Sequence, residues 1–143
     1  MAVSINIRVD AEQAAAALNA FAMAGTYPLM KTIGTLVEGQ TKRRIAVEKR
    51  SPDGAPWAPL KPSTIANRRK RSSSILTDTG RLLGSISHTA TSRQAIIGTN
   101  VEYAGFHQSG TRKMVARPFM GVSPANMVEI KAAVNAWVEG LLG

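Results

Sequence analysis

Apolar and polar residues alternate at the start of the chain and again near its middle. In Val3–Val9 every second residue is apolar, and a repeat of two places those side chains on one face of a strand. Ser85–Thr91 and Ala95–Thr99 favour two further strands, and the polar stretch Ser92–Gln94 between them is typical of a hairpin turn. The pattern therefore predicts one N-terminal strand and a later hairpin.

Three longer segments have the spacing or the end residues of helices. Ala11–Ala24 lies between an aspartate that can cap a helix start and a glycine that can end one. A second helix is predicted to begin at Pro28, with apolar residues three and four positions apart, and to become basic toward Arg50. A third is predicted at Pro124–Leu142, with Ser123 as its N-cap.

Proline, glycine and short polar runs divide the rest of the chain. These local signals predict a loop at Ser51–Pro62, a short helix at Thr64–Arg71 capped by Ser63, a helical turn at Thr77–Leu83, a strand or a helix at Val101–Gln108, a basic loop at Gly110–Ala116 and a strand at Phe119–Val122.

The order of these elements predicts the fold class. Strands that cluster together, with helices at both ends, indicate an α+β domain with a mainly antiparallel sheet packed against helices. The length of 143 residues suits a single domain covering residues 1–143. Inside it lies a proline-rich and basic loop region at about 51–74. Two parts of it, Ser51–Pro62 and Arg68–Ser74, are expected to pack poorly in the isolated subunit, because such residues bury little apolar surface.

Positive charge is concentrated in one part of the sequence. The chain carries a formal charge of +9, and residues 42–71 contribute +8 of it through ten basic and two acidic residues. Such a segment is either a solvated face or a surface that attracts a polyanion or an acidic protein. The residues predicted to face a partner or DNA are Lys42, Arg43, Arg44, Arg68, Arg69, Lys70 and Arg71.

The form of any DNA contact is limited by the aromatic residues. No aromatic residue lies between Trp57 and Tyr103, so base stacking is not expected near the basic segment. Any contact with DNA would involve phosphates, and it would be independent of sequence and sensitive to salt.

Few residues are candidates for catalysis or metal binding. The chain has no cysteine and two histidines, His88 and His107, which do not form a metal-binding or triad spacing. His88 is interpreted as a structural or surface residue. Asp53 and Asp78 lie in turn-like sequences, where aspartate commonly accepts hydrogen bonds from the main chain. We therefore predict no catalytic residues, no metal, no cofactor and no enzymatic activity.

The sequence contains no signal for a membrane. The first ten residues lack the continuous apolar run of a signal peptide, and the longest apolar runs are too short to cross a bilayer. The protein is therefore expected to be made and folded in a cytoplasm without a membrane partner.

Three segments, in this order, resemble the phage virion morphogenesis family, the tail completion proteins of Mu-like and related contractile-tailed phages. Their order and spacing make the resemblance fairly specific, although it covers only about half of the chain, between residues 51 and 121. The segments are Ser51–Leu60 with Pro62–Thr64, Ile75–Ile86, and Val101–Gly110 with Ala116–Gly121.

The resemblance implies a structural role in the virion. It predicts an oligomeric ring, hexameric by that likeness, which acts as a tail terminator at the head-proximal end of the tail and permits head–tail joining. The implied partners are further copies of the chain, tail tube and neck proteins, and packaged DNA through non-specific contact. Assembly would take place in the cytoplasm of the host bacterium. Trp57, Arg117 and Phe119 are the predicted assembly contacts.

Two other classes of function stay open at this point. The first is a free, sequence-independent DNA-binding protein that uses the basic segment 42–71. The second is a small hydrolase, which only Asp53, Asp78 and His107 could serve.

Overall fold

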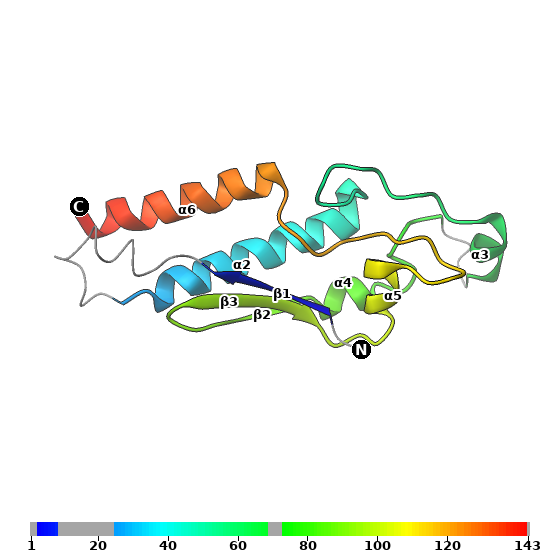
Figure 1. Ribbon diagram of the computed structural model, residues 1–143, viewed down its shortest axis with the longest axis horizontal. Helices are drawn as coiled ribbons and strands as arrows, with labels where there is room; N and C mark the ends of the chain where they lie inside the picture. Colours follow the sequence, from blue (N-terminus) through cyan, green and yellow to red (C-terminus); the bar gives the residue numbers. More distant parts are fainter. Residues whose placement is uncertain (1–2, 9–24, 69–72, 143) are drawn as a thin grey trace.

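The computed structural model describes residues 3–8, 25–68 and 73–142, so the predicted helix Ala11–Ala24 lies outside the described residues. Helices and one small sheet form an elongated α+β unit, as the sequence predicted (Figure 1). In chain order the elements are β1 (Val3–Arg8), α2 (Tyr27–Arg43), the π-helical segment η2 (Arg44–Glu48), α3 (Pro62–Asn67), α4 (Arg81–Ser85), β2 (Ser87–Ala90), β3 (Gln94–Thr99), α5 (Ala104–Ser109) and α6 (Pro124–Leu142).

The sheet has three antiparallel strands in the order β1-β3-β2. Its register places Val3 opposite Thr99, and the central strand β3 points Ala95 and Ile97 into the core, where neither is exposed. The predicted N-terminal strand and hairpin are therefore confirmed. Strand β2 is shorter than the predicted Ser85–Thr91 because the first residue of that range belongs to helix α4.

Helix α2 is the middle layer of the molecule. The sheet packs on one side of it and α6 on the other (Figure 1). Leu29, Ile33 and Val37 form its fully buried apolar face, at the helical spacing that predicted this helix. Gly34 lets the sheet approach closely, because a Cβ atom there would lie 2.5 Å from Cδ2 of His88 on β2.

Helix α6 is the outer layer and begins as predicted. The hydroxyl oxygen of Ser123 accepts the main-chain N–H of Asn126 at 3.0 Å, which is an N-cap bond. Asn126 also joins the helix to α2, because its carbonyl oxygen accepts Nε2 of Gln40 at 3.2 Å. Ile130 is buried against the core, whereas Met127 stays 42% exposed, so only part of the predicted apolar stripe is covered within the described subunit.

Several predicted elements differ in the structure. Phe119–Val122 forms no strand, and the segment is extended chain without a strand partner. The short helix α3 ends before Arg68, and Lys61 rather than Ser63 occupies its N-cap position. The predicted turn at Thr77–Leu83 is helix α4, which starts later, and the ambiguous segment Val101–Gln108 is resolved as helix α5.

Candidate functional site

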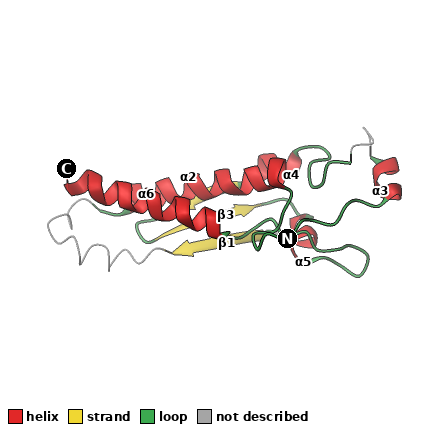
Figure 2. Ribbon diagram, turned by 90° about the horizontal axis from the view of Figure 1, so that it is seen from above, coloured by secondary structure: helices red, strands yellow, loops and turns green. Residues whose placement is uncertain are grey.

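The three sequence segments that carry the family resemblance lie together at one end of the molecule. We call this region, residues 49–68, 73–86 and 101–121, the loop end. It contains α3, α4 and α5, and it lies opposite the C-terminal end of α6 (Figures 1 and 2). The layered body, by contrast, consists of the sheet, α2 and α6.

Trp57 anchors the proline-rich loop to the third segment. Its indole Nε1 donates to the carbonyl oxygen of Pro118 at 2.8 Å, and the residue is only 6% exposed. Trp57 is therefore an exception to the predicted poor packing of the Ser51–Pro62 loop, in which residues 53–56 stay exposed. A buried tryptophan compensates for the little apolar surface that the prolines around it contribute.

Arg117 reinforces the same junction from the other side. Its Nε donates to the carbonyl oxygen of Ala58 at 2.8 Å, and one terminal nitrogen donates to that of Pro59 at 3.0 Å. The main-chain N–H of Arg117 donates to the carbonyl oxygen of His107 at 2.7 Å, which adds helix α5 to the junction. One guanidinium group thus satisfies two loop carbonyls whose backbone belongs to no sheet or helix.

Gln108 explains why the segment after Arg117 is not a strand. Its Oε1 accepts the main-chain N–H groups of Phe119 and Met120, each at 3.1 Å, and its Nε2 donates to the carbonyl oxygen of Met120 at 3.3 Å. A single side chain therefore supplies the hydrogen bonds that a neighbouring strand would supply. Phe119 itself is fully buried.

The three predicted assembly contacts thus act inside the subunit. Trp57, Arg117 and Phe119 are 6%, 8% and 0% exposed, and their hydrogen bonds join segments of the same chain. They hold the loop end together and offer little surface to another molecule. A large aromatic residue in a proline-rich sequence indicates an anchor, but the sequence does not tell whether the anchor is internal or external.

Arg44 also requires a correction, because it was predicted to face a partner or DNA. It is 2% exposed, and its guanidinium donates to the carbonyl oxygens of Phe119 at 2.7 Å and Gly121 at 3.2 Å and to Oδ1 of Asn126. Burial lowers its pKa, while nearby Glu48 acts in the opposite direction. The residue ties the body to the loop end.

The other basic residues of segment 42–71 have different surroundings. Lys49 is turned inward, and its Nζ donates to the carbonyl oxygen of Ile75 at 2.6 Å and to the hydroxyls of Ser74 and Thr77, each at 3.2 Å. Lys42 is partly exposed and pairs with Glu38 at 3.4 Å, while Arg43, Arg50 and Lys61 are exposed. Arg69, Lys70 and Arg71 lie outside the described residues. The predicted cationic segment is therefore not one continuous surface.

Beside α3 and α4 the loop end contains a cavity of about 620 Å³. Arg68 lies in its wall, donates to the carbonyl oxygen of Ser74 at 2.5 Å, and has its Nε 3.9 Å from Oδ1 of Asp78. The complete lining is Thr64, Asn67, Arg68, Leu76, Asp78, Thr79, Gly80, Arg81, Leu82, Tyr103 and His107. Sequence reasoning did not single out Arg81 or Tyr103, because no periodic pattern links them.

Aromatic contacts order one wall of this cavity. The guanidinium carbon of Arg81 lies 5.9 Å from the ring centre of Tyr103, which is a cation–π contact. The ring of Tyr103 in turn meets that of His107 edge-on, with ring centres 5.6 Å apart. Burial lowers the pKa of His107, and the charges of Arg117 and Arg68 lower it further. His107 is therefore held in its neutral form near pH 7.

The candidates for catalysis are accounted for by structural contacts. Oδ1 of Asp53 accepts the main-chain N–H of Ala55 at 3.0 Å, which confirms the predicted capping role. Asp78 instead pairs with Arg68, so the capping prediction is wrong for that residue. His107 and Asp78 line one cavity, but Nδ1 of His107 is buried and has no hydrogen-bond partner among the described residues. An oriented catalytic base would need such a partner.

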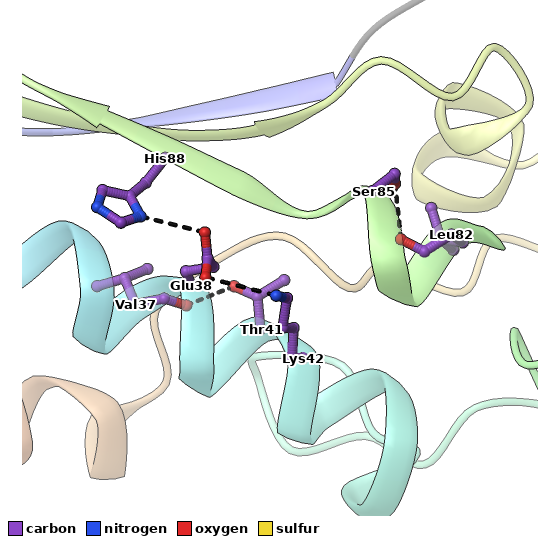
Figure 3. A network of polar contacts seen from close by, with 7 residues as sticks. All are labelled: Val37, Glu38, Thr41, Lys42, Leu82, Ser85 and His88. Atoms are coloured by element: carbon purple, nitrogen blue, oxygen red, sulfur yellow. Dashed lines mark hydrogen bonds and ion pairs between the residues drawn. The ribbon is translucent and has the colours of Figure 1, made fainter. Parts of the chain in front are cut away.

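His88 lies in the body and connects β2 to α2 (Figure 3). Its Nδ1 is 3.1 Å from Oε1 of Glu38, whose second oxygen lies 3.4 Å from Nζ of Lys42. With the imidazole packed on Gly34, this contact supports the structural role predicted for the residue. In the described ranges, acidic residues and histidines do not gather into a group of three or more that could hold a metal ion.

Comparison of the sequence with models of protein families relates this chain to known proteins. The model of the phage virion morphogenesis family matches residues 8–139. The chain belongs to this family. The resemblance detected in residues 51–121 therefore extends over most of the chain, including the body.

Two Mu-like prophage proteins of Haemophilus influenzae are similar to this family member. FluMu G protein 2 is 29% identical over 142 residues, which cover 93% of this chain and 94% of that protein. FluMu G protein 1 is 48% identical over 54 residues, and the match spans only 38% of this chain and 37% of that protein. No solved structure gives a significant match.

Family membership establishes a role in phage morphogenesis and an association with the phage particle. Among the helices that the structure describes, none combines the length and apolar character required to cross a bilayer.

Proposed function

We propose that this protein is a structural virion component that completes the head-proximal end of the tail. In that role it acts as a tail terminator, assembles into a ring, and makes the tail competent to join a head. The observation that carries the proposal is the family match over residues 8–139. The protein performs no catalytic step in this role.

The construction of the loop end supports this role. Its irregular backbone is fixed by buried and partly buried side chains, among them Trp57, Gln108 and Arg117, so it presents a preformed surface. A ring repeats one surface around its axis, and each copy must present the same shape to its neighbour. A preformed surface lowers the ordering entropy that each new contact would otherwise cost.

The proposal is tested in a phage that lacks this gene, with the gene supplied in trans as the control. We expect separate heads and tails in electron micrographs of the mutant lysate, together with a large loss of infectious particles. Complete particles at a normal titre in the absence of the gene would contradict the proposal.

Native mass spectrometry of the purified protein tests the ring separately. A protein that stays monomeric, both alone and in the presence of tails, would argue against the ring.

A sequence-independent DNA-binding protein is the second candidate function. The exposed residues Arg43, Arg50 and Lys61, with partly exposed Lys42, favour it, because they leave positive charge at the surface. The inward contacts of Arg44 and Lys49 weaken it, because they remove two cations from the predicted binding segment. Binding of duplex DNA by the isolated protein, with a steep dependence on salt, would favour this alternative.

A further inference from the structure

The 620 Å³ cavity of the loop end is large enough for a ligand of several residues. Trp57, Gln108 and Lys49, whose side chains tie segments of the loop end together, are absent from its lining. Its wall combines two guanidinium groups and the polar side chains of Thr64, Asn67 and Thr79 with the ring of Tyr103, whereas the leucines in the lining are buried. A cavity lined in this way can hold a charged group.

Positive charge predominates in the wall. Arg68 and Arg81 are opposed by one carboxylate, that of Asp78, which pairs with Arg68. Arg81 forms no ion pair within the described part of the chain, and its guanidinium lies over the ring of Tyr103. Contact with an aromatic face leaves the N–H groups at the edge of a guanidinium available to two oxygens of one carboxylate.

The wall is also held in an uncommon conformation. Leu76 is buried and has a φ of 61°, in the left-handed region that residues other than glycine rarely adopt. The carbonyl oxygen of the preceding residue, Ile75, accepts Nζ of Lys49 at 2.6 Å, which fixes this part of the wall. The cavity is thus shaped before any ligand arrives.

The concave shape of the cavity favours an acidic peptide over duplex DNA as its ligand. Duplex DNA carries its phosphates on a stiff convex surface and cannot enter a recess, whereas a flexible peptide can insert one side chain. We propose that this cavity binds an acidic segment of a partner protein, with a carboxylate held by the exposed guanidinium of Arg81.

This inference rests on the proposed function in one respect, which is that the partner is another virion protein. Arg69, Lys70 and Arg71 directly follow Arg68 in the sequence. They lie outside the described residues, and by sequence alone they contribute to the +8 charge of residues 42–71, which attracts an acidic segment over a distance.

Binding is measured with a short fluorescent peptide of alternating glutamate and leucine. The controls are a peptide with glutamine in place of glutamate and a labelled DNA duplex. We expect the purified full chain to bind the glutamate peptide and Arg81→Gln to bind it about tenfold more weakly. Arg112→Gln is the matched variant, because Arg112 is exposed at the same end but does not line the cavity. It should change affinity by less than about twofold.

Three outcomes would contradict the proposed binding site. Equal losses in the two variants would show general attraction by a basic protein, and equal binding of the glutamine peptide would remove the role of the carboxylate. Preferential binding of the duplex that Arg81→Gln abolishes would assign the cavity to DNA. Because Arg81 is exposed, its replacement should leave the fold intact, and an unchanged thermal unfolding curve confirms that.

A phage carrying Arg81→Gln connects the cavity with assembly. We expect fewer joined particles than with Arg112→Gln. If peptide binding is lost but particles form normally, a virion partner for this cavity is ruled out while the proposed tail role stands. If the gene can be deleted without effect on assembly, the proposed function fails, whereas peptide binding by the cavity in vitro would remain.

Discussion

The layered body and the loop end are stabilised in different ways. In the body, Ile33 and Val37 of α2 and Ile97 of β3 are fully buried, and regular backbone hydrogen bonds satisfy the strands and helices. In the loop end, side chains such as Trp57 and Gln108 bind main-chain groups that have no regular partner. Apolar burial stabilises both regions, because Phe119 and Met120 of the loop end belong to the same buried core, and the loop end depends in addition on individual polar contacts.

The difference matters because many weak apolar contacts hold the body together, whereas a few specific hydrogen bonds hold the irregular backbone of the loop end. In a close-packed core each apolar side chain makes many contacts, and each of these contacts is weak by itself. Loss of Gln108 would leave two main-chain N–H groups without their acceptor. The loop end should therefore be more sensitive to polar substitutions than the body.

Phe119 provides the largest expected effect, because it brings apolar burial into the loop end. Phe119→Ala should lower the free energy of unfolding by about 3–5 kcal/mol, since the residue is fully buried. Phe106→Ala is the matched control at a position that is 52% exposed, and it should change stability by less than about 0.5 kcal/mol. Urea unfolding followed by circular dichroism measures both. Similar effects for the two would contradict the packing described for Phe119.

A pair of glutamines compares the two regions directly. Gln108→Leu should cost about 2–4 kcal/mol, because the N–H groups of Phe119 and Met120 lose their acceptor. Gln40→Leu in the body removes one bond to Asn126 and one buried oxygen, Oε1, that has no partner in the described structure. It should therefore cost less than about 1 kcal/mol. Hydrogen exchange should locate the first loss at residues 119–120, and a reversed order of the two costs would refute the comparison.

A pair of glycines makes the same comparison for the backbone. Gly110 has a φ of 75°, and a Cβ atom there would lie 2.8 Å from the main-chain nitrogen of Ala116. Gly110→Ala should therefore destabilise the protein by about 1–3 kcal/mol. Gly39 lies in α2 with open space around an added Cβ, so Gly39→Ala should stabilise it by about 0.5–1 kcal/mol. Thermal unfolding should show a lower melting temperature for the first variant and a higher one for the second. A change in the same direction for both would contradict the prediction.

The same contrast explains how much of the structure the sequence could predict. In the body the information is local and periodic: alternation predicted β1, and helical spacing predicted α2 and α6. In the loop end the information is pairwise and distant. Trp57 binds a carbonyl group 61 residues away, and such a contact leaves no repeat in the sequence. The resemblance identified the three segments but not the bonds between them.

The charge of a residue is also a poor guide to its location. Residues 42–71 have a net charge of +8, yet Arg44 is buried while its neighbour Arg43 is exposed. The sequence did distinguish the two residues, because Arg44 falls at helical spacing from Val37 and Gln40 and so continues the buried face of α2 into η2. The cavity was not predictable in this way, because Arg68, Arg81 and His107 come from separate segments.

The smallest expected effect is a pH dependence that originates in the loop end. Burial lowers the pKa of His107 below its ordinary value of 6.5, and the charges of Arg117 and Arg68 lower it further. As the pH falls through 6.5, the unfolded chain binds a proton that the folded chain does not bind, so stability decreases. The loss continues until the pH reaches the lowered pKa of the folded state, with a slope of at most about 1.4 kcal/mol per pH unit.

The measurement compares wild type with His107→Gln in urea between neutral and mildly acidic pH. The glutamine side chain of this variant cannot take up a proton. As the pH falls, the free energy of unfolding of the wild type should therefore decrease relative to that of the variant. His88 is present in both proteins and lies in the body, where it contacts Glu38 rather than the cavity, so the comparison isolates His107. Parallel stability curves would mean that His107 titrates alike in the folded and unfolded chains, and the electrostatic description of the cavity wall would then be wrong.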